Sequence, residues 1–371
     1  MGKDIVAVTM PKWGLAMEEG TVAAWHVREG AVVAKDDDLA DIETTKITNL
    51  FEAPAAGTVR RLVVAEGAVA PVGALLSVIA DPVVPEAEID AFVAGFEAEV
   101  APREAAAEPV ETAMIDTGGR RLRVLSLGDG AGDPVVFVHG FGADLNGWMF
   151  NQPVIAERRP THALDLPGHG GSVKSVGDGR AATLADAVAA ALDALGIDRA
   201  HLVGHSLGGA VAIALALARP ERVASLGLIA PAGLASGING DFIAGFIAAK
   251  RRKQLRPVLD MLVADPGLVG REMIEEVLRF KRLDGVADAL RAIAEANFAD
   301  GRQSLALAPR LGEIAAPILI VQGTEDRIIP AIRAEDLPAT VTLHRLAGAG
   351  HVPHLEKAAE VNALLDSFLA A

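Results

Sequence analysis

The sequence of 371 residues contains no cysteine. This absence excludes disulfide bonds, a cysteine nucleophile and thiolate metal sites, and it fits a reducing compartment. The first residues, MGKDIVAVTMPKWG, lack the basic start and long apolar run of a secretory signal, and no apolar stretch is long enough to cross a bilayer. We therefore expect a soluble, cytoplasmic protein with no membrane partner, and we predict no metal-ligating residues.

Negative charge is concentrated in one short segment. The net charge is −15, yet residues 113–371 carry 26 basic and 29 acidic residues, which nearly balance. Residues 81–112 carry one basic and nine acidic residues. Because this distribution gives no broad positive surface, we do not expect nucleic acid as a partner.

The acidic segment, residues 81–112, is rich in alanine, proline and glutamate. Repulsion between like charges and the stiffness of proline predict an extended linker between two domains. Part of the segment has helical periodicity, which would place five apolar residues on one face: Ile89, Phe92, Val93, Phe96 and Val100. Such a helix would either pack on a neighbouring domain or dock a partner enzyme.

Residues 20–42 and 57–79 form an internal repeat with a period of 37 residues. GTVAAWHVREGAVV aligns with GTVRRLVVAEGAVA, and each copy has β-rich runs broken by a Glu-Gly turn. One copy is too small to bury its own apolar face. We therefore expect the two copies to close on each other as a flattened all-β barrel, with approximate twofold symmetry, over residues 1–80.

Lys46 lies in the connection between the two copies. The flanking runs LADIE and ITNLFEAP predict paired strands, so the lysine would stand at a hairpin tip where a modifying enzyme can reach it. Residues 1–80 resemble lipoyl and biotinyl carrier domains, and IETTKI is similar to the lipoyl attachment hairpin. This resemblance implies covalent lipoate on Lys46. Biotin and an unmodified lysine are the alternatives, although the methionines that normally flank a biotinyl lysine are absent.

Beyond residue 112, apolar strand candidates alternate with helical stretches. The strands include PVVFVHG, AHLVGHS, ASLGLIAP and APILIVQG, which predicts a mostly parallel sheet with helices on both faces. GHSLGG, residues 204–209, follows one strand and precedes a helix, as a nucleophile elbow requires. We expect Ser206 to be the nucleophile. The turn is so tight that positions 204 and 208 require a small residue, and both are glycine.

Two backbone amides are candidate oxyanion donors. The amide of Leu207 begins the helix after the serine, where the helix dipole favours negative charge. The amide of Phe141, in VHGFGAD, is the second candidate because the glycines let that loop turn. We expect His139, in the same loop, to order the loop and to take no part as a base.

A serine needs a base to act as a nucleophile at neutral pH. His351, in AGAGHVPHLEK, follows a strand candidate and precedes the last helix, whereas His354 would be structural. Asp326 follows the strand in VQGTEDRIIP and could orient the imidazole, with Glu325 as the alternative. The order Ser206, Asp326, His351 along the chain is typical of the α/β-hydrolase family, which residues 113–371 resemble.

A helical segment, about residues 232–305, interrupts the strand pattern and is similar to the cap of that family. It contains AAKRRKQLRP, in which five basic residues lie close together: Lys250, Arg251, Arg252, Lys253 and Arg256. This cluster is a solvated helix face, a docking patch for the lipoyl domain or linker, or a phosphate clamp for coenzyme A.

The combination of the two domains resembles the acyltransferase component, a dihydrolipoyllysine acetyltransferase, of acetoin dehydrogenase complexes. The resemblance implies transfer of an acetyl group from the lipoyl arm to coenzyme A. It also implies three partners: a thiamine-diphosphate-dependent acetoin-cleaving enzyme, a dihydrolipoyl dehydrogenase and a lipoate ligase. We also expect a homo-oligomer. The His-x-x-x-Asp-Gly motif of the usual 2-oxoacid dehydrogenase acyltransferases is absent.

Two other functions fit the same residues. A carrier-tethered hydrolase would use the triad to release the acyl group to water, or to cleave another ester or a C–C bond. A non-catalytic carrier and scaffold would use the hydrolase domain only as a docking surface. The triad alone does not separate transfer from hydrolysis, nor an acyl-serine from direct transfer between thiols.

Overall fold

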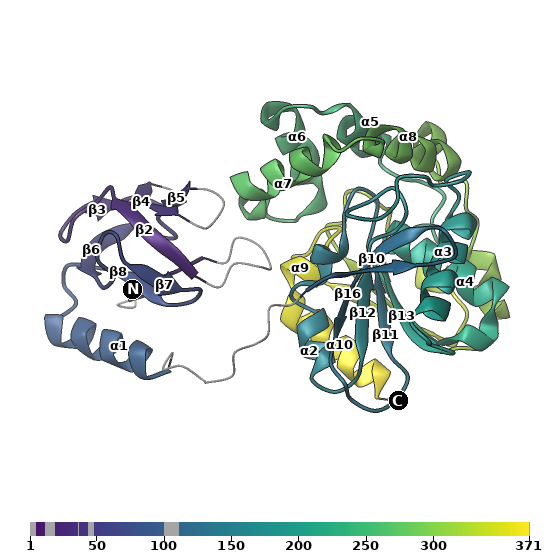
Figure 1. Ribbon diagram of the computed structural model, residues 1–371, viewed down its shortest axis with the longest axis horizontal. Helices are drawn as coiled ribbons and strands as arrows, with labels where there is room; N and C mark the ends of the chain where they lie inside the picture. The colour runs from purple at the N-terminus through teal and green to yellow at the C-terminus, as the bar shows by residue number, and fades with distance from the viewer. Residues whose placement is uncertain (1–4, 12–18, 36, 44–47, 100–110, 371) are drawn as a thin grey trace. The chain divides into compact units, whose positions relative to one another are not determined.

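The computed structural model describes residues 5–11, 19–35, 37–43, 48–99 and 111–370. The chain divides into two compact units, residues 1–110 and residues 111–371 (Figure 1). Lys46, the predicted attachment site, and Val100 of the predicted helical face lie outside the described residues.

The first unit contains two four-stranded sheets. One has the order β1 (Val6–Thr9), β8 (Leu75–Ala80), β6 (Gly57–Leu62), β3 (Val32–Val33), and the other β5 (Thr48–Glu52), β4 (Asp38–Glu43), β2 (Glu19–Trp25), β7 (Val69–Pro71). The repeat exchanges strands, because β3 of the first copy pairs with β6 of the second and β7 of the second pairs with β2 of the first. Val22 and Ile42 of one sheet share a core with Val59 and Ile79 of the other. The prediction that the two copies close on each other is confirmed.

The strands on either side of the segment with Lys46 are paired. β4 and β5 run antiparallel, with Glu43 opposite Thr48, so only residues 44–47 separate the two paired ends. The prediction of paired strands flanking Lys46 is confirmed.

Helix α1 (Glu86–Glu99) occupies part of the segment that we expected to be an extended linker. Its apolar face covers the first unit, because Ile89 is fully buried against Val78 and Ala80 of β8. Arg61 forms ion pairs with the helix at Glu86 (3.1 Å) and Asp90 (2.7 Å). The prediction of a helix in this part of the segment is therefore confirmed, and of its two expected roles the structure shows packing on the neighbouring domain. The reason is physical: β8 is buried on both faces, and α1 supplies the apolar cover for its second face.

The second unit is built on one eight-stranded sheet. Its order is β16 (Val341–Leu346), β15 (Ile318–Gly323), β14 (Val223–Ile229), β13 (Ala200–His205), β11 (Val135–Val138), β12 (Thr161–Leu164), β10 (Arg121–Leu127), β9 (Ala113–Asp116). The strands from β16 to β12 are parallel, and β10 and β9 are antiparallel. The central strands are buried throughout, as strands covered on both faces must be.

Helices pack on the sheet, and a further group of helices forms the cap. The sheet helices are α2 (Gln152–Ala156), α3 (Ala181–Ala194), α4 (Leu207–Ala218), α9 (Pro353–Glu356) and α10 (Ala358–Leu369). The cap helices are α5 (Gly240–Ala248), α6 (Arg252–Leu259), α7 (Arg271–Lys281) and α8 (Val286–Asn297). Figure 1 shows α5 to α8 gathered at one end of the unit. The predictions of a mostly parallel sheet and of a helical segment between β14 and β15 are confirmed. Within the described residues, no helix has the length and apolar character needed to cross a bilayer.

Candidate active site

Ser206 lies in a strained turn between β13 and α4. Its backbone has φ 51° and ψ −115°, a conformation that costs a non-glycine residue about 1–3 kcal/mol. The neighbouring glycines are required by close approach. A Cβ on Gly208 would lie 2.1 Å from the Val138 carbonyl oxygen, and one on Gly204 would lie 2.5 Å from the Gly208 carbonyl oxygen. The sequence of the elbow therefore fits its geometry, which holds the serine at the carboxyl end of β13.

His351 and Asp326 are in direct contact. The His351 Nδ1 lies 3.0 Å and 3.1 Å from the two carboxylate oxygens of Asp326, and both side chains are 2% exposed. Asp326 follows β15 and His351 follows β16, so both lie at the carboxyl edge of the sheet, as Ser206 does. Glu325, the alternative acid, is exposed. The contact with Asp326 places the proton on Nδ1 and leaves Nε2 of His351 as the basic nitrogen.

Asp326 is held in its charged form. Burial opposes ionisation, but the interaction with His351 and hydrogen bonds from the Ile329 and Ile328 amides outweigh it, so the pKa of Asp326 is lowered. A buried carboxylate in this position stabilises the imidazolium that forms when the histidine accepts a proton.

The loop after β11 approaches the elbow closely. A Cβ on Gly140 would lie 3.2 Å from the Ser206 Cβ, so this loop passes directly beside the nucleophile. The Phe141 side chain is buried against the rings of Phe246 (5.8 Å between centroids) and Phe298 (6.1 Å) of the cap segment. On the other side, Leu207 is the first residue of α4, where backbone amides have no partner within the helix.

His139 orders this loop, as expected. Its Nε2 accepts a hydrogen bond from the Leu166 amide (3.0 Å), and its Nδ1 donates to the Gly140 carbonyl (2.8 Å). Burial lowers the pKa of His139. The ring is therefore neutral and holds the loop in place.

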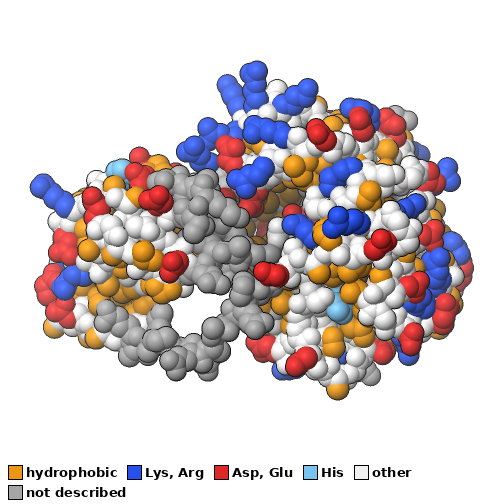
Figure 2. Space-filling model, in the orientation of Figure 1, with side chains coloured by type: hydrophobic (Ala, Val, Ile, Leu, Met, Phe, Trp, Pro, Cys, Tyr) orange, Lys and Arg blue, Asp and Glu red, His pale blue; other side chains and the backbone are white. Residues whose placement is uncertain are grey.

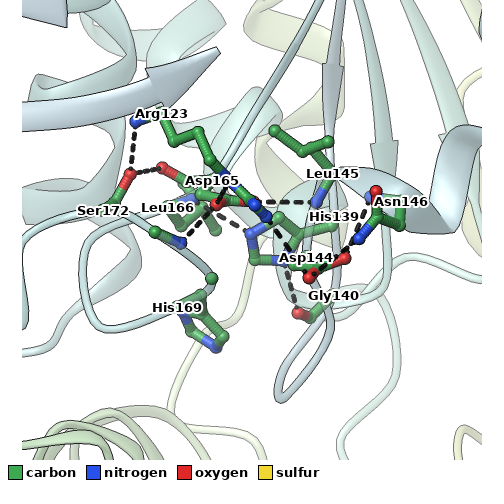
Figure 3. A network of polar contacts seen from close by, with 12 residues as sticks. Arg123, His139, Gly140, Asp144, Leu145, Asn146, Asp165, Leu166, His169 and Ser172 are labelled. Atoms are coloured by element: carbon green, nitrogen blue, oxygen red, sulfur yellow. Dashed lines mark hydrogen bonds and ion pairs between the residues drawn. The ribbon is translucent and has the colours of Figure 1, made fainter. Parts of the chain in front are cut away.

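A partly buried ionic network supports the same loop (Figure 3). Asp165, fully buried after β12, pairs with Arg123 Nε at 2.6 Å and accepts hydrogen bonds from the amides of Leu145 (2.8 Å) and Gly171 (2.7 Å). Arg123 also reaches Asp144 at 3.4 Å. Sequence reasoning missed this network. The available signal was Asp165 in LDLPGHG, an acid directly after a parallel strand.

Two further buried histidines pack beside His351. The His205 ring lies 4.9 Å from His351 and 4.5 Å from His354, and its Nε2 is 2.9 Å from the His351 carbonyl oxygen. Burial holds the pKa of His205 well below its usual value and lowers that of His354 to about 3. Both are neutral, which fits the structural role expected for His354.

The five basic residues of the predicted cluster are not equally available. Arg252 pairs with Glu275 at 3.0 Å, and Arg256 pairs with Asp260 at 2.8 Å. Within the described residues, Lys250, Arg251 and Lys253 form no ion pair, and all three are exposed. Figure 2 shows Lys and Arg side chains gathered over the cap helices.

Comparisons with known proteins agree with this architecture. Residues 133–358 match the model of the alpha/beta hydrolase fold, and residues 6–79 match that of the biotin-requiring enzymes, which describes biotinyl and lipoyl domains. A Cupriavidus necator protein is 45% identical over 98% of this chain and 97% of its own length. A Pseudomonas putida protein is 47% identical over 98% of both chains. Each is named the dihydrolipoyllysine-residue acetyltransferase component of an acetoin-cleaving system. This chain belongs to that acetyltransferase family.

The catalytic unit of this acetyltransferase is also similar to solved hydrolases. A meta-cleavage product hydrolase from Pseudomonas fluorescens covers 70% of this chain and 97% of its own, with a TM-score of 0.64 and 25% identity. That match leaves 30% of this chain uncovered. The family members at 45–47% identity span both units.

Proposed function

We propose that this acetyltransferase works through Ser206, His351 and Asp326, with residues 1–80 carrying the acyl arm and residues 113–371 the active site. Its function is transfer of an acetyl group from a lipoyl-lysine to coenzyme A in acetoin catabolism. The observation that carries the mechanism is the contact between His351 and Asp326 at the sheet edge where the strained Ser206 also lies. We propose Lys46 as the lipoyl lysine and residues 81–112 as the connection between the domains.

Lipoate, bound to a lysine, supplies a thiol that carries the acetyl group as a thioester. His351 Nε2 accepts the proton of Ser206 as the serine oxygen attacks the acetyl carbonyl carbon. The amides of Phe141 and Leu207 donate to the oxyanion. The C–S bond then breaks, and His351 returns the proton to the leaving thiolate, which leaves an acetyl-serine.

The second half-reaction reverses the roles. His351 accepts the proton of the coenzyme A thiol as the sulfur attacks the acetyl-serine carbonyl. The C–O bond breaks and the proton returns to Ser206, so atoms and charge balance and the enzyme is regenerated. Direct transfer between the two thiols, without acetyl-serine, would use the same base and the same oxyanion donors.

Coenzyme A needs cationic contacts far from its thiol. We propose that the cluster at Lys250, Arg251, Arg252, Lys253 and Arg256 provides phosphate contacts. Guanidinium groups suit phosphate oxygens, and three of the five side chains have no acidic partner among the described residues.

The chain acts with other subunits of the acetoin-cleaving system, the acetoin-cleaving enzyme and dihydrolipoyl dehydrogenase. We further propose a lipoate ligase as the modifying enzyme, a cytoplasmic location and a homo-oligomer. Intact-mass analysis after expression with a lipoate ligase tests the attachment site. One lipoyl adduct is expected, and Lys46→Arg should remove it; an adduct that survives this substitution would place lipoate elsewhere.

Supplying S-acetyl-dihydrolipoamide with and without coenzyme A tests the reaction. Acetyl-coenzyme A is the expected product. Free acetate alone would indicate the tethered hydrolase, which the similarity to a solved hydrolase keeps as the second candidate. No turnover would indicate a scaffold. A stoichiometric acetyl adduct on the protein that is absent from Ser206→Ala would distinguish acetyl-serine from direct transfer.

A further inference from the structure

The cap contains a pocket of about 340 Å³ between α5, α7 and α8. Its apolar wall includes Ile247, Leu278 and Leu290, and its charged side chains are Lys250, Lys281 and Arg282. Of these three, Lys250 alone also belongs to the basic cluster at residues 250–256. The pocket therefore combines an apolar interior with three positive charges from two separate segments.

These charges have no acidic partners among the described residues. Lys281 is half-buried, and its ammonium donates to the carbonyl oxygens of Phe246 and Ile247 at the end of α5. Burial lowers the pKa of Lys281 to about 8. Residues 250–282 contain nine basic and five acidic residues, in a chain with a net charge of −15. A half-buried cation without a carboxylate is costly, and an anionic ligand would offset that cost.

The pocket lies close to the catalytic loop. The Lys281 ammonium is 4.8 Å from the centre of the Phe246 ring, and the Phe246 ring is 5.8 Å from that of Phe141. A Cβ on Gly142 would lie 2.4 Å from the Phe246 ring, so the ring packs directly on the loop. One aromatic side chain thus contacts both a pocket lysine and the residue whose amide we assign to the oxyanion.

A ligand suited to this pocket has a flat apolar ring and several negative charges at its edge. The adenosine 3′-phosphate diphosphate end of coenzyme A has these properties, and its long pantetheine arm separates them from the thiol. We propose that this pocket binds the nucleotide end of coenzyme A, with Lys250, Lys281 and Arg282 facing its phosphates. This inference rests on the proposed function and locates the coenzyme A site more narrowly than the basic cluster at residues 250–256 does.

Calorimetric measurement of adenosine 3′,5′-bisphosphate binding to the full chain tests the pocket without any thiol chemistry. Lys250→Ala and Arg282→Ala should each weaken binding by about tenfold, the loss typical of a hydrogen bond to a charged group. Arg291→Ala on α8 is the matched control, because Arg291 pairs with Asp288 and does not line the pocket. Lys281→Gln is a weaker test, since Lys281 also supports the end of α5. No binding to the unaltered protein, or equal losses in the Arg291 variant, would overturn the inference.

Kinetics separate this inference from the proposed function. Arg282→Ala should raise the KM for coenzyme A about tenfold with kcat unchanged, and leave the KM for N-acetylcysteamine as it is. If the unaltered chain acetylates coenzyme A and Arg282→Ala leaves its KM unchanged, the pocket inference fails and the function stands. If the nucleotide binds but coenzyme A is never acetylated, the function fails and the pocket stands.

Discussion

The catalytic edge of the sheet and the helical cap above it are built in different ways. At the sheet edge, Ser206 and His351 are almost fully buried. Their positions follow from strand register and from close backbone approaches, such as those at Gly204 and Gly208, that leave no room for a side chain. In the cap, Arg251 and Lys253 are exposed and their side chains contact no acid among the described residues. Under the proposed function, the groups that make and break bonds are fixed by backbone geometry, whereas the acceptor would be recognised through charge. Substitutions in the two regions should therefore have effects of different size and kind.

The largest effect is expected at the nucleophile. Ser206→Ala should lower the rate of acetyl-coenzyme A formation by about 10⁴-fold or more, because the variant lacks the oxygen proposed to attack the acetyl carbonyl. Asp326→Asn should lower the rate less than Ser206→Ala does, since His351 is still present as the base. Steady-state rates with S-acetyl-dihydrolipoamide measure both losses, and unchanged melting temperatures would show that the fold is intact.

Glu325→Gln is the matched control for Asp326→Asn, because the two acids are adjacent but only Asp326 contacts His351. Its rate should stay close to that of the unaltered protein. If Glu325→Gln were more damaging than Asp326→Asn, the assignment of the acid would be wrong.

The elbow also predicts a difference in stability between the two regions. Gly208→Ala should destabilise the hydrolase unit by about 3 kcal/mol or more, because its Cβ would overlap the Val138 carbonyl and force α4 away from the sheet. Gly270→Ala, at the start of cap helix α7, meets nothing within 4 Å and should cost less than about 1 kcal/mol. Urea denaturation followed by circular dichroism compares the two, and similar midpoints would contradict the comparison.

The buried histidines predict a loss of stability in acid. His354 resists protonation in the folded protein until about pH 3, whereas an unfolded histidine takes up a proton near pH 6.5. Between these values the unfolded state binds more protons, so stability falls as the pH falls, by about 1.4 kcal/mol per pH unit for each such group. In the cap the sign reverses, because burial and Glu276 raise the pKa of Glu272 to about 7. That glutamate contributes stability that is lost as the pH rises toward 7.

Melting temperatures measured from pH 7.5 to pH 5 test this expectation. His354→Phe keeps a ring against Trp148 and His205 but removes the titrating group, so its acid-induced loss should be smaller. His344→Gln, on an exposed position of β16, is the control and should keep the original slope. Equal slopes in all three proteins would mean that protonation of His354 does not contribute to acid unfolding.

The parts that could be predicted from the sequence are those with a local chemical signature. The elbow glycines, the strands before Asp326 and His351, and the 37-residue repeat each follow from residues close together in the chain. The choice between Asp326 and Glu325 could not be settled in the same way. Adjacent residues at a strand end point in different directions, and only the register of β15 beside β16 brings one of them to the histidine.

Contacts between distant segments were the main omission. Arg123 and Asp165 are 42 positions apart in the sequence, and no local sequence pattern indicates that they form an ion pair. The apolar periodicity of residues 89–96 predicts helix α1. Its packing partner could not be predicted, because the sequence does not show that the barrel leaves one face of β8 uncovered. The pairing of Arg252 with Glu275 was likewise hidden, since it joins two cap helices. A basic run in a sequence therefore overstates the charge that is available to a ligand.

The smallest expected effect is in this basic run. Arg251→Ala with Arg252→Ala should raise the KM for coenzyme A about two- to fivefold, the range for exposed charge pairs, and make it less sensitive to salt. Because Arg252 already pairs with Glu275, Arg251→Ala alone should account for most of the change. The rate with a small uncharged thiol should barely change, since that acceptor has no phosphate. Equal losses with both acceptors would contradict a phosphate contact and leave these arginines a structural or docking role. In that case the cap would affect the reaction through its fold and not through its charge.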